Sequence, residues 1–532
     1  MVAKESGKES ELDERLSALV TNVTAVRAVT SAIEGTLGPN GLDVLLVGRL
    51  GDVVVSNDGA TILETMDASH PAARMLIRAA RAQEEEVGDG TTTTVILAGA
   101  LVSEGAGQVA RGVPISRVLQ GIEFGLEKAA EFIRSRARVL GGTGRAHRRT
   151  VVDPSDQVSP QGVLLQAAKI AARGQSEVAK LVVAAAQVVG QRRLKESSFR
   201  FKDLIVGQEG GASRVIGGVL IHRDTEPMGD EVNWPIRDAR ILVVDDALEP
   251  EKIDEEALRT ESGFARFLAC QEEFRQHLHK LVELGVNLVV VDRSAAEIAH
   301  EILGDAGVAL FERVPLSEWR RAAEHTGARP VKRTMLRRGP EDLARCLGFA
   351  RRADFDQALK QLQLTSGRGA RTATVVLSAA TAEVMDERLR IGRDAASAVQ
   401  ATVQGGYVPG GGAIEIAAGL HLEKLRGELP GMAGFGLECV IEALTRPLSQ
   451  IVANSGFNPL EKVREVMQRQ AVSGCDSLGI DCETGEVCEM LARGVIDPAP
   501  VKVNALRTAG EIAQAVLRVN TIIKKRERDG RV

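Results

Sequence analysis

A chain of 532 residues is longer than one hydrophobic core can organise, so its length predicts several domains. Apolar residues make up 44% and charged residues 26%, which is typical of a globular protein. The net charge of -5 gives no overall attraction to nucleic acid or to an anionic membrane, and the longest apolar runs are too short to span a bilayer. We therefore expect neither nucleic acid nor a membrane as a partner.

Cysteine usage and the first residues predict a cytoplasmic protein. The six cysteines form no C-x-x-C pair, and residues 1–15 lack the apolar core of a signal peptide. Three cysteines cluster at Cys475, Cys482 and Cys488, but their spacing matches no zinc pattern and no histidine lies nearby in the sequence. Ordinary packing is therefore favoured over a metal role.

The beginning of the chain has helical periodicity. Apolar residues at helical spacing predict a helix over 12–35, and the turn residues 37–41 end it. Short β-branched runs at 43–47 and 52–56 predict a hairpin. This hairpin would deliver the Asn-Asp-Gly motif of residues 57–59 at its end.

Two further helices are expected over 71–87 and 91–105, separated by the tight turn Gly88-Asp89-Gly90. The following stretch at 141–160 is rich in Gly, Pro, Ser and Arg and has little core-forming pattern. It predicts a domain boundary or a long loop.

From residue 217 onward, β-rich runs alternate with helical stretches, which indicates an α/β domain. The strands expected there are 218–222, 240–244, 287–291 and 308–312. Residues 366–371 have a loop-like composition, and 373–378 predict a further strand. From residue 382 to the end the pattern is helical, with a break at 405–412.

The order of these regions is helical, then α/β, then helical. It fits an α/β domain inserted into a helical one, with a connecting module that the chain crosses twice. The predicted fold class is therefore multidomain α+β. Because such an insertion brings distant residues together, motifs near residues 40, 90, 394, 411 and 497 are expected to share one site.

The turn at Gly88-Asp89-Gly90 and the four threonines after it form the first candidate site. Free N–H groups at a helix start attract phosphate, hydroxyls add donors, and glycine lets the backbone approach closely. Asp89 supplies the oxygen ligand that Mg²⁺ prefers. The alternative is a capped helix without a ligand, but four consecutive threonines are poor helix formers and favour a binding role.

Other candidates are weak when taken one at a time. The glycine-containing loops at 36–41 and 410–412 are more often plain turns. Asp58 follows a predicted strand and Asp394 lies in a predicted helix, where a single aspartate is usually solvated or caps a helix. Only their combination with the Asp89 turn points to a shared site.

Several motifs, in this order, resemble blocks of the group II chaperonins, the family that includes the thermosome and the cytosolic chaperonin. Together the matching blocks extend over nearly the whole chain, which makes them far more specific than any single glycine loop. The nucleotide-site blocks are residues 36–39, 57–63, 70–73, 86–92 and 410–413, and the closing blocks are residues 454–459, 494–498 and 501–502.

The resemblance implies an equatorial ATPase domain built from both chain ends, a hinge-like intermediate domain and an apical α/β domain. These would comprise residues 1–142 and 404–532 (equatorial), 143–213 and 364–403 (intermediate), and 214–363 (apical), with a helical lid protrusion at about 247–274. This division agrees with the three-part pattern found above.

The resemblance also implies roles for individual residues around ATP and Mg²⁺, with K⁺ as a further possible ion. Asp89 would hold Mg²⁺, and Asp394 would act as general base on the attacking water, which Asp58 would help to place. The residues expected at the nucleotide are Thr36, Leu37, Gly38, Pro39, Asn57, Gly90, Thr91, Thr92, Thr93, Gly411, Gly412, Gly479 and Asp497. Among them, threonines 91–93 would contact phosphates, and Gly411 and Asp497 would face base and ribose.

The implied function is ATP-driven folding of non-native polypeptide clients inside a homo- or hetero-oligomer of two stacked rings, of about eight subunits each. A built-in lid would remove the need for a separate co-chaperonin. Phe264, Phe267, Leu268 and Phe274 are the lid residues expected to contact neighbours or clients, the alternative being a plain amphipathic helix. A nucleotide-binding structural assembly or holdase is the alternative function, whereas a metabolic kinase lacks a recognisable substrate motif.

Some positions depart from the family pattern. Asn40 stands where a lysine is common, and Arg173 lies in a short version of a loop where many relatives carry a nucleotide-sensing lysine. A planar guanidinium is not equivalent to an ammonium, so this sensing function is not expected to carry over unchanged. The basic cluster at 145–149 has no counterpart and is interpreted as a solvated loop. These departures fit the bacterial group III relatives as readily as an archaeal thermosome.

Overall fold

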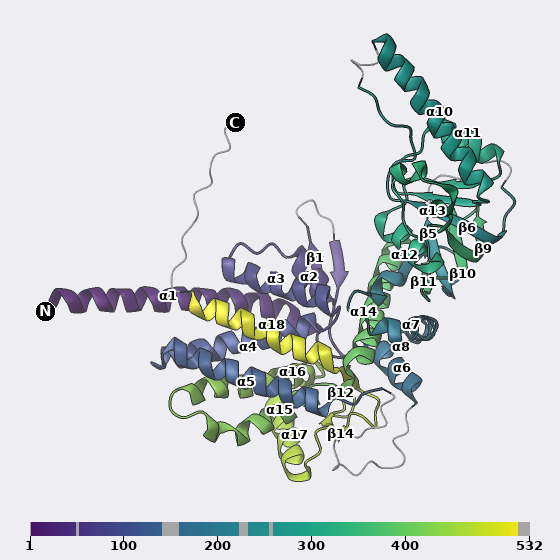
Figure 1. Ribbon diagram of the computed structural model, residues 1–532. Coiled ribbons are helices and arrows are strands. Elements are labelled where there is room, and N and C mark those ends of the chain that lie inside the picture. Colours follow the sequence, from purple (N-terminus) through teal and green to yellow (C-terminus); the bar gives the residue numbers. More distant parts are fainter. Residues whose placement is uncertain (1, 49–52, 141–158, 223–231, 255–258, 520–532) are drawn as a thin grey trace. The chain divides into compact units, whose positions relative to one another are not determined.

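The computed structural model describes residues 2–48, 53–140, 159–222, 232–254 and 259–519, and the chain forms two compact units (Figure 1). The first unit combines residues 1–183 with 390–532, and the second comprises residues 184–389. The basic cluster at 145–149 lies outside the described residues. The finer division into equatorial, intermediate and apical domains stays a prediction.

The first unit is mainly helical. Its helices are α1 (Val2–Ile33), α2 (Gly59–Thr65), α3 (Pro71–Glu86), α4 (Thr91–Ala110), α5 (Ile115–Arg136), α6 (Pro160–Ala171), α15 (Ala413–Lys424), α16 (Ala433–Asn454), α17 (Pro459–Ser473) and α18 (Ala499–Arg518), with short 3-10 turns η1 (Glu34–Thr36) and η4 (Arg426–Glu428). Helices α7 (Ser176–Val189) and α14 (Ala382–Gly405) begin in one unit and end in the other. The expected helices at 71–87 and 91–105 are confirmed as α3 and α4.

The core of the first unit lies where α4, α5, α16 and α18 pack side by side (Figure 1). Leu101, Ile122, Val440 and Ala509, one from each of these helices, are fully buried there. Local signals set several helix starts because a side chain accepts the first free N–H groups and proline suits the first turn. Asn458 caps α17 in this way, directly before Pro459.

Short strand pairs complete the first unit. The expected hairpin is confirmed as β1 (Val44–Val47) and β2 (Val53–Ser56), which pair antiparallel. The sequence pattern predicts helices from residue 382 to the end with a break at 405–412, and β12 (Tyr407–Pro409) lies in that break. The prediction is wrong where the short strands β13 (Leu478–Ile480), β14 (Val487–Glu489) and β15 (Ile496–Pro498) replace the expected helix. Strand β12 pairs with β15, and β13 pairs with β14.

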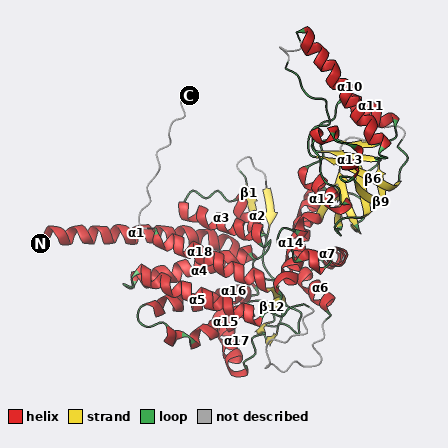
Figure 2. Cartoon of the chain, in the orientation of Figure 1, coloured by secondary structure: helices red, strands yellow, loops and turns green. Residues whose placement is uncertain are grey.

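The second unit is an α/β structure around a six-stranded sheet (Figure 2). The sheet order is β5 (Gly218–His222), β10 (Gln361–Gly367), β9 (Gly348–Asp356), β6 (Ile236–Val244), β7 (Leu288–Val291) and β8 (Ala309–Phe311). Strands β6, β7 and β8 run parallel, and the other neighbours are antiparallel. A smaller sheet joins β3 (Ile205–Glu209), β11 (Thr374–Ala379) and β4 (Arg214–Ile216).

Helices cover both faces of the six-stranded sheet. One core contains side chains of α10 (Glu261–Glu283) and α11 (Glu297–Asp305), and the other contains side chains of α12 (Leu316–Thr326). The remaining short helical segments of this unit are α8 (Gln191–Leu194), η2 (Phe201–Leu204), η3 (Arg333–Arg337) and α13 (Pro340–Ala344). The α/β pattern and the strands expected at 218–222, 240–244, 287–291, 308–312 and 373–378 are thus confirmed, whereas residues 366–367 of the expected loop belong to β10.

A buried histidine at the end of α12 ties this helix to the chain that follows β10. His325 contacts the carbonyl oxygen of Ala370 through Nδ1 (3.2 Å) and accepts the backbone N–H of Gly367 at Nε2 (3.1 Å). Because one ring nitrogen accepts, this arrangement requires the neutral ring. Burial lowers the pKa of His325, in agreement with that requirement.

Candidate functional site

The turn predicted to bind phosphate and metal lies between α3 and α4 in the first unit. Gly90 has φ of 82° and precedes α4, and a Cβ on it would come within 2.7 Å of Val501. Glycine is therefore required both by the left-handed backbone and by the close approach of α18. The N–H of Gly90 donates to Asp89 Oδ1 (2.6 Å), which fixes the carboxylate at the start of α4.

Buried polar side chains of α3 and α18 hold the backbone of this turn in place. The side-chain amide of Gln83, fully buried on α3, donates to the carbonyl oxygen of Asp89 (2.9 Å). Asn504 of α18 in turn donates to Gln83 Oε1 (2.8 Å). The position of Asp89 is thus determined by hydrogen bonds from two core helices and not by the loop alone.

The four threonines differ in their surroundings. Thr91 donates its hydroxyl hydrogen to Glu84 Oε2 (3.0 Å), and Thr94 is fully buried and donates to the carbonyl oxygen of Gly90 (3.0 Å). Thr92 and Thr93 are half-buried. Thr92 lies against Gly59, where a Cβ would approach its hydroxyl to 2.4 Å. Phosphate contact therefore stays a prediction, and Thr92 and Thr93 have the more accessible hydroxyls.

The structure brings Asp58 and Asp394 together through Arg390. Nη1 of Arg390 lies 2.9 Å from Asp394 Oδ2 and 3.4 Å from Asp58 Oδ1. Asp58 also caps α2, because its Oδ2 accepts both the N–H (2.9 Å) and the hydroxyl (2.7 Å) of Thr61. The capping role that is usual for a single aspartate is confirmed, and it leaves the other carboxylate oxygen directed at Arg390.

Burial and mutual repulsion disfavour the ionised forms of two of these carboxylates. Burial raises the pKa of Asp394 well above its ordinary value; Arg390 opposes the shift, and the carboxylates of Glu84, Asp58 and Asp89 add to it. Burial, together with the charge of Asp497, raises the pKa of Asp89 to about 7. Carboxylates that gather so closely stay ionised only when a cation compensates them.

These residues fit a bound Mg²⁺ of the kind that nucleotides bring. Within the described part of the chain, no three Asp, Glu, His or Cys side chains form a complete metal cage. Mg²⁺ does not need one, because it keeps several waters and binds through one or two carboxylates and substrate phosphates. Asp89, at the start of α4 and close to other carboxylates, suits this mode of binding.

The loop at 36–39, which is predicted to line the nucleotide, lies against α16. Asn454 donates its side-chain amide to the carbonyl oxygens of Glu34 (3.0 Å) and Leu37 (2.8 Å). Gly38 has φ of 91° and a Cβ there would meet Ile451 at 3.2 Å. Asn40, where a lysine is common in the family, donates to the carbonyl oxygen of Cys482 (3.3 Å). The loop is therefore held by its neighbours in the first unit.

The glycines after β12 lie beside β15 and the β13–β14 hairpin. Strand pairing places Val408 opposite Asp497, and a Cβ on Gly410 would come within 3.2 Å of the Asp497 carboxylate. Gly411 and Gly479 both approach Met490, with the nearest distances from a Cβ at 3.4 and 2.8 Å. The predicted residues Gly411, Gly479 and Asp497 thus lie in one region of the first unit, although their contact with a nucleotide stays a prediction.

Sequence reasoning missed most of the residues that support this site. Glu415 and Asn504 act through partners far away in the sequence, and Arg390 reaches Asp58 in the same way, so no local spacing indicates these contacts. Gln83 and Glu84 contact Asp89 and Thr91 across the turn between α3 and α4, where nothing in their residue type marks a role. Lys502 lies in a block that matched the family, but its role was not visible there. Arg173 follows α6 with a left-handed backbone (φ 50°), and a sensing role for it stays a prediction.

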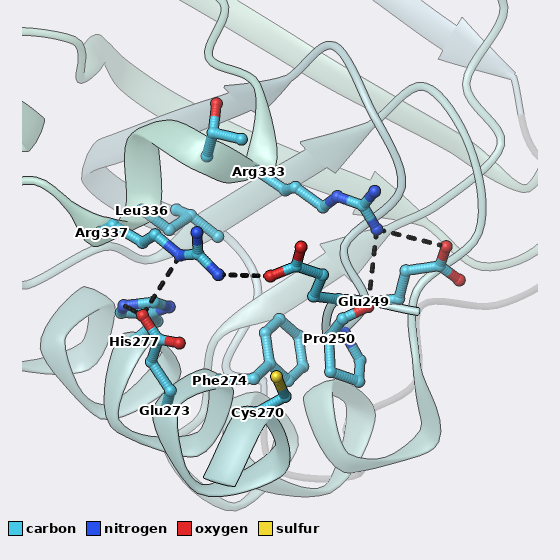
Figure 3. A pocket seen from close by; sticks show the side chains of 11 residues that line it. Glu249, Pro250, Cys270, Glu273, Phe274, His277, Arg333, Leu336 and Arg337 are labelled. Carbon is cyan, nitrogen blue, oxygen red and sulfur yellow. Dashed lines mark hydrogen bonds and ion pairs between the residues drawn. The ribbon is translucent and has the colours of Figure 1, made fainter. Parts of the chain in front are cut away.

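The second unit has a separate cavity of about 100 Å³ at the base of α10 (Figure 3). Five of the eleven residues that line it are charged, and these charges are paired with one another: Arg337, for example, contacts Glu251 (2.7 Å) and Glu273 (3.2 Å). Phe274 forms its apolar side and is only 4% exposed. The expectation that Phe274 is an exposed lid residue is therefore wrong, because it packs into the core under the sheet.

The exposed part of α10 lies nearer its start. Phe264 and Leu268 are each 53% exposed, and the rings of Phe264 and Phe267 stack with centroids 6.4 Å apart. Ala247 and Leu248 are buried, and residues 255–258 lie outside the described part of the chain. A lid role stays a prediction, and the residues that could serve it are the apolar ones near the start of α10.

The fold and the site together define a chaperonin, and comparisons with known proteins establish the family. Residues 29–527 match the TCP-1/cpn60 chaperonin family, and the chain belongs to it. It is 31% identical over 520 residues to the thermosome subunit of Pyrococcus horikoshii, covering 94% of this chain and 90% of that protein. The identity to the thermosome subunit beta of Aeropyrum pernix is also 31%, covering 95% of this chain and 91% of that protein.

One solved structure has a higher sequence identity to this chain than these two thermosome subunits have. The crystal structure of a group III chaperonin in the open state matches with a TM-score of 0.83 and 42% identity, covering 96% of this chain and all of that one. The chaperonin fold, and the thermosome-like character expected from the sequence, are thereby confirmed. Among the described residues, no helix is long and apolar enough to cross a membrane.

Proposed function

We propose that this chaperonin subunit hydrolyses ATP at the site in the first unit and uses the cycle to fold non-native proteins inside a ring chamber. The observation that carries the proposal is the convergence of Asp58, Asp89 and Asp394 at the start of α4, where Arg390 contacts Asp58 and Asp394 and the charge of Asp89 acts on Asp394. Such a region suits a magnesium-bound triphosphate, whose metal neutralises charge that develops in phosphoryl transfer.

In this proposal each residue has a defined task. Asp89 would hold Mg²⁺, and Thr92, Thr93 and the free N–H groups at the start of α4 would bind phosphate oxygens. Asp394 would accept the proton of the attacking water, since a raised pKa brings a carboxylate nearer to the operating pH of a general base. Arg390 would orient Asp394 and hold it near Asp58.

Asp394 lies on α14, a helix that begins in the second unit and ends in the first. A base on such a helix can reach the phosphate or withdraw from it when the units move, which would couple hydrolysis to closure of the chamber. The exposed apolar residues of α10 would serve as a built-in lid. We infer that the assembly has two stacked rings of about eight subunits. The branch is group III, because identity to the group III structure exceeds identity to the two thermosome subunits.

The test compares turnover with refolding. Purified protein is given a chemically denatured client with ATP, with a non-hydrolysable ATP analogue, or without nucleotide, and client activity is followed with ATP hydrolysis. We expect recovery of client activity only with ATP, and rings in negative-stain images. Equal recovery with the analogue would favour the alternative, a holdase or structural assembly that binds nucleotide without needing turnover.

A further inference from the structure

Behind the predicted ribose carboxylate lies a buried charged triad that the mechanism above does not use. Lys502, in the first turn of α18, places Nζ 2.7 Å from Asp497 Oδ2 of β15 and 2.7 Å from Glu415 Oε1 of α15. The side chains of Glu415 and Lys502 are only 1% and 10% exposed, whereas that of Asp497 is 21% exposed. The triad therefore runs from the core towards the surface and ends at Asp497.

The two carboxylates favour the charged form of Lys502. Burial disfavours the ammonium of Lys502, but Asp497 and Glu415 more than offset it and raise the pKa of Lys502. A buried ion pair of this kind is weak evidence for stability, because well-packed apolar residues serve the core as well or better. Its position, directly behind a partly exposed carboxylate, favours a role in holding that carboxylate.

The contacts around Asp497 restrain one of its two carboxylate oxygens and leave the other facing a loop. Lys502 contacts Oδ2, while a Cβ built on Gly410 would come within 3.2 Å of Oδ1, so Oδ1 faces the glycine loop after β12. Strand pairing between Asp497 and Val408 fixes the backbone on the same side. A carboxylate restrained at one oxygen offers the other as a hydrogen-bond acceptor in a fixed direction.

We propose that Lys502, anchored by Glu415, is a positioning residue that fixes Asp497 as acceptor for a ribose hydroxyl and so sets the preference for ribonucleotides. This inference rests on the proposed nucleotide site. Lys502 would not touch the nucleotide itself. Without the ammonium of Lys502, Asp497 would lose the contact that restrains Oδ2, and the acceptor would lose its direction.

The test measures binding of ATP and of 2′,3′-dideoxy-ATP, each with Mg²⁺, to the full chain. A hydrogen bond to a charged acceptor predicts that the wild type prefers ATP by about tenfold or more. The variant Lys502→Met with Glu415→Gln removes the cation and one buried carboxylate together, so that no uncompensated charge stays near Asp497 in the core. We expect ATP binding to weaken until the preference is about twofold, with dideoxy-ATP binding unchanged.

Two further variants separate positioning from folding. Lys502→Arg retains a cation for Asp497 and is expected to keep most of the preference. Lys462→Met, which removes another partly buried lysine of the first unit paired with Glu465, is the matched control and should change neither affinity.

The binding results separate the positioning role of Lys502 from a purely structural role and from failure of the proposed nucleotide site. A wild-type preference in the Lys502→Met, Glu415→Gln protein, or an equal loss of both nucleotides together with a lower unfolding temperature, would overturn the positioning role. If that double variant does not fold, Lys502→Gln, which removes only the cation, replaces it. Loss of the preference with normal dideoxy-ATP binding would then support the positioning role, and an unchanged preference or equal weakening of both nucleotides would overturn it. Failure of the wild type to bind either nucleotide would refute the proposed function instead.

Discussion

Replacing Asp394 by asparagine gives the sharpest test of the catalytic site, because it removes one charge and keeps the size of the side chain. In the unsubstituted chain, Nη1 of Arg390 lies 2.9 Å from Asp394 Oδ2 and 3.4 Å from Asp58 Oδ1. The amide oxygen of the asparagine can still accept a hydrogen bond from Arg390. The geometry of the cluster is therefore retained, and only proton acceptance is lost.

The magnitude follows from the task assigned to this carboxylate. A positioned general base contributes about 10²- to 10⁴-fold to the rate, so kcat for ATP hydrolysis should fall by that factor. On the barrier this is about 3–5 kcal/mol. ATP affinity should change by no more than about threefold, because a base acts on the water in the transition state and adds little to ground-state binding.

Stability provides an internal check on the same substitution. The pKa of Asp394 is raised chiefly because its ionised form is poorly solvated in this cluster. A neutral amide avoids that cost, so the unfolding temperature should stay the same or rise. Lower activity in a protein that is at least as stable would exclude misfolding as the cause.

The assay is single-turnover hydrolysis at saturating ATP, with binding measured separately. Asp386→Asn is the matched control, since Asp386 is an exposed aspartate on the same helix about two turns earlier, and it should hydrolyse ATP at the wild-type rate. A rate for Asp394→Asn within about threefold of wild type would refute the assignment of the base. So would a loss of rate that is matched by an equal loss of ATP affinity.

Three other perturbations follow from the structure. Asp58→Ser keeps a good helix cap and should lower the rate of ATP hydrolysis at near-normal stability. Asp58→Ala removes the cap as well and should lower the free energy of unfolding, measured by chemical denaturation, by about 1 kcal/mol. Equal hydrolysis rates for Asp58→Ser and wild type would exclude a role for the charge. His325 has a lowered pKa in the folded protein, so its contribution to folding stability is fully present above the pKa of about 6.5 that it has in the unfolded chain. That stability is lost as the pH falls towards the lower folded pKa. The unfolding temperature of His325→Gln should therefore vary less between pH 7 and pH 5 than that of wild type. Serine at both Phe264 and Leu268 should reduce protease protection of the ATP-closed ring while leaving single-turnover hydrolysis unchanged, and full protection would contradict the lid role.

Local sequence signals were sufficient to predict the two helices that border the turn at residues 88–90. Glycine and aspartate at 88–90 interrupt two long apolar periodicities, and the structure has α3 and α4 on either side of them. The parallel strands of the second unit were equally visible because each contains a continuous apolar run. The run at 288–291, for example, is buried at every position.

Elements that depend on distant partners were not visible. Strand β9 contains Arg351 and Arg352 in succession, which breaks the alternation expected of a strand, and pairing with β6 and β10 stabilises it instead. Strand β12 has three residues and pairs with β15 almost ninety positions later. No local pattern identifies such strands, because their stability comes from the helices packed around them.

The same reasoning explains which site residues a sequence reveals. Asp89 stands out because turn chemistry surrounds it, whereas Gln83, Lys502 and Asn504 look like ordinary helix residues. Yet α18 supports both halves of the proposed site within about one turn: Lys502 contacts Asp497, and Asn504 acts through Gln83 on the backbone of Asp89. Because these supports lie in a packed helical core, the proposed metal turn at Asp89 and the proposed ribose carboxylate of Asp497 are fixed relative to each other. The proposed base, Asp394 on α14, is then the part of the site whose position depends on a helix shared with the second unit, so under this proposal it is the part that regulates turnover.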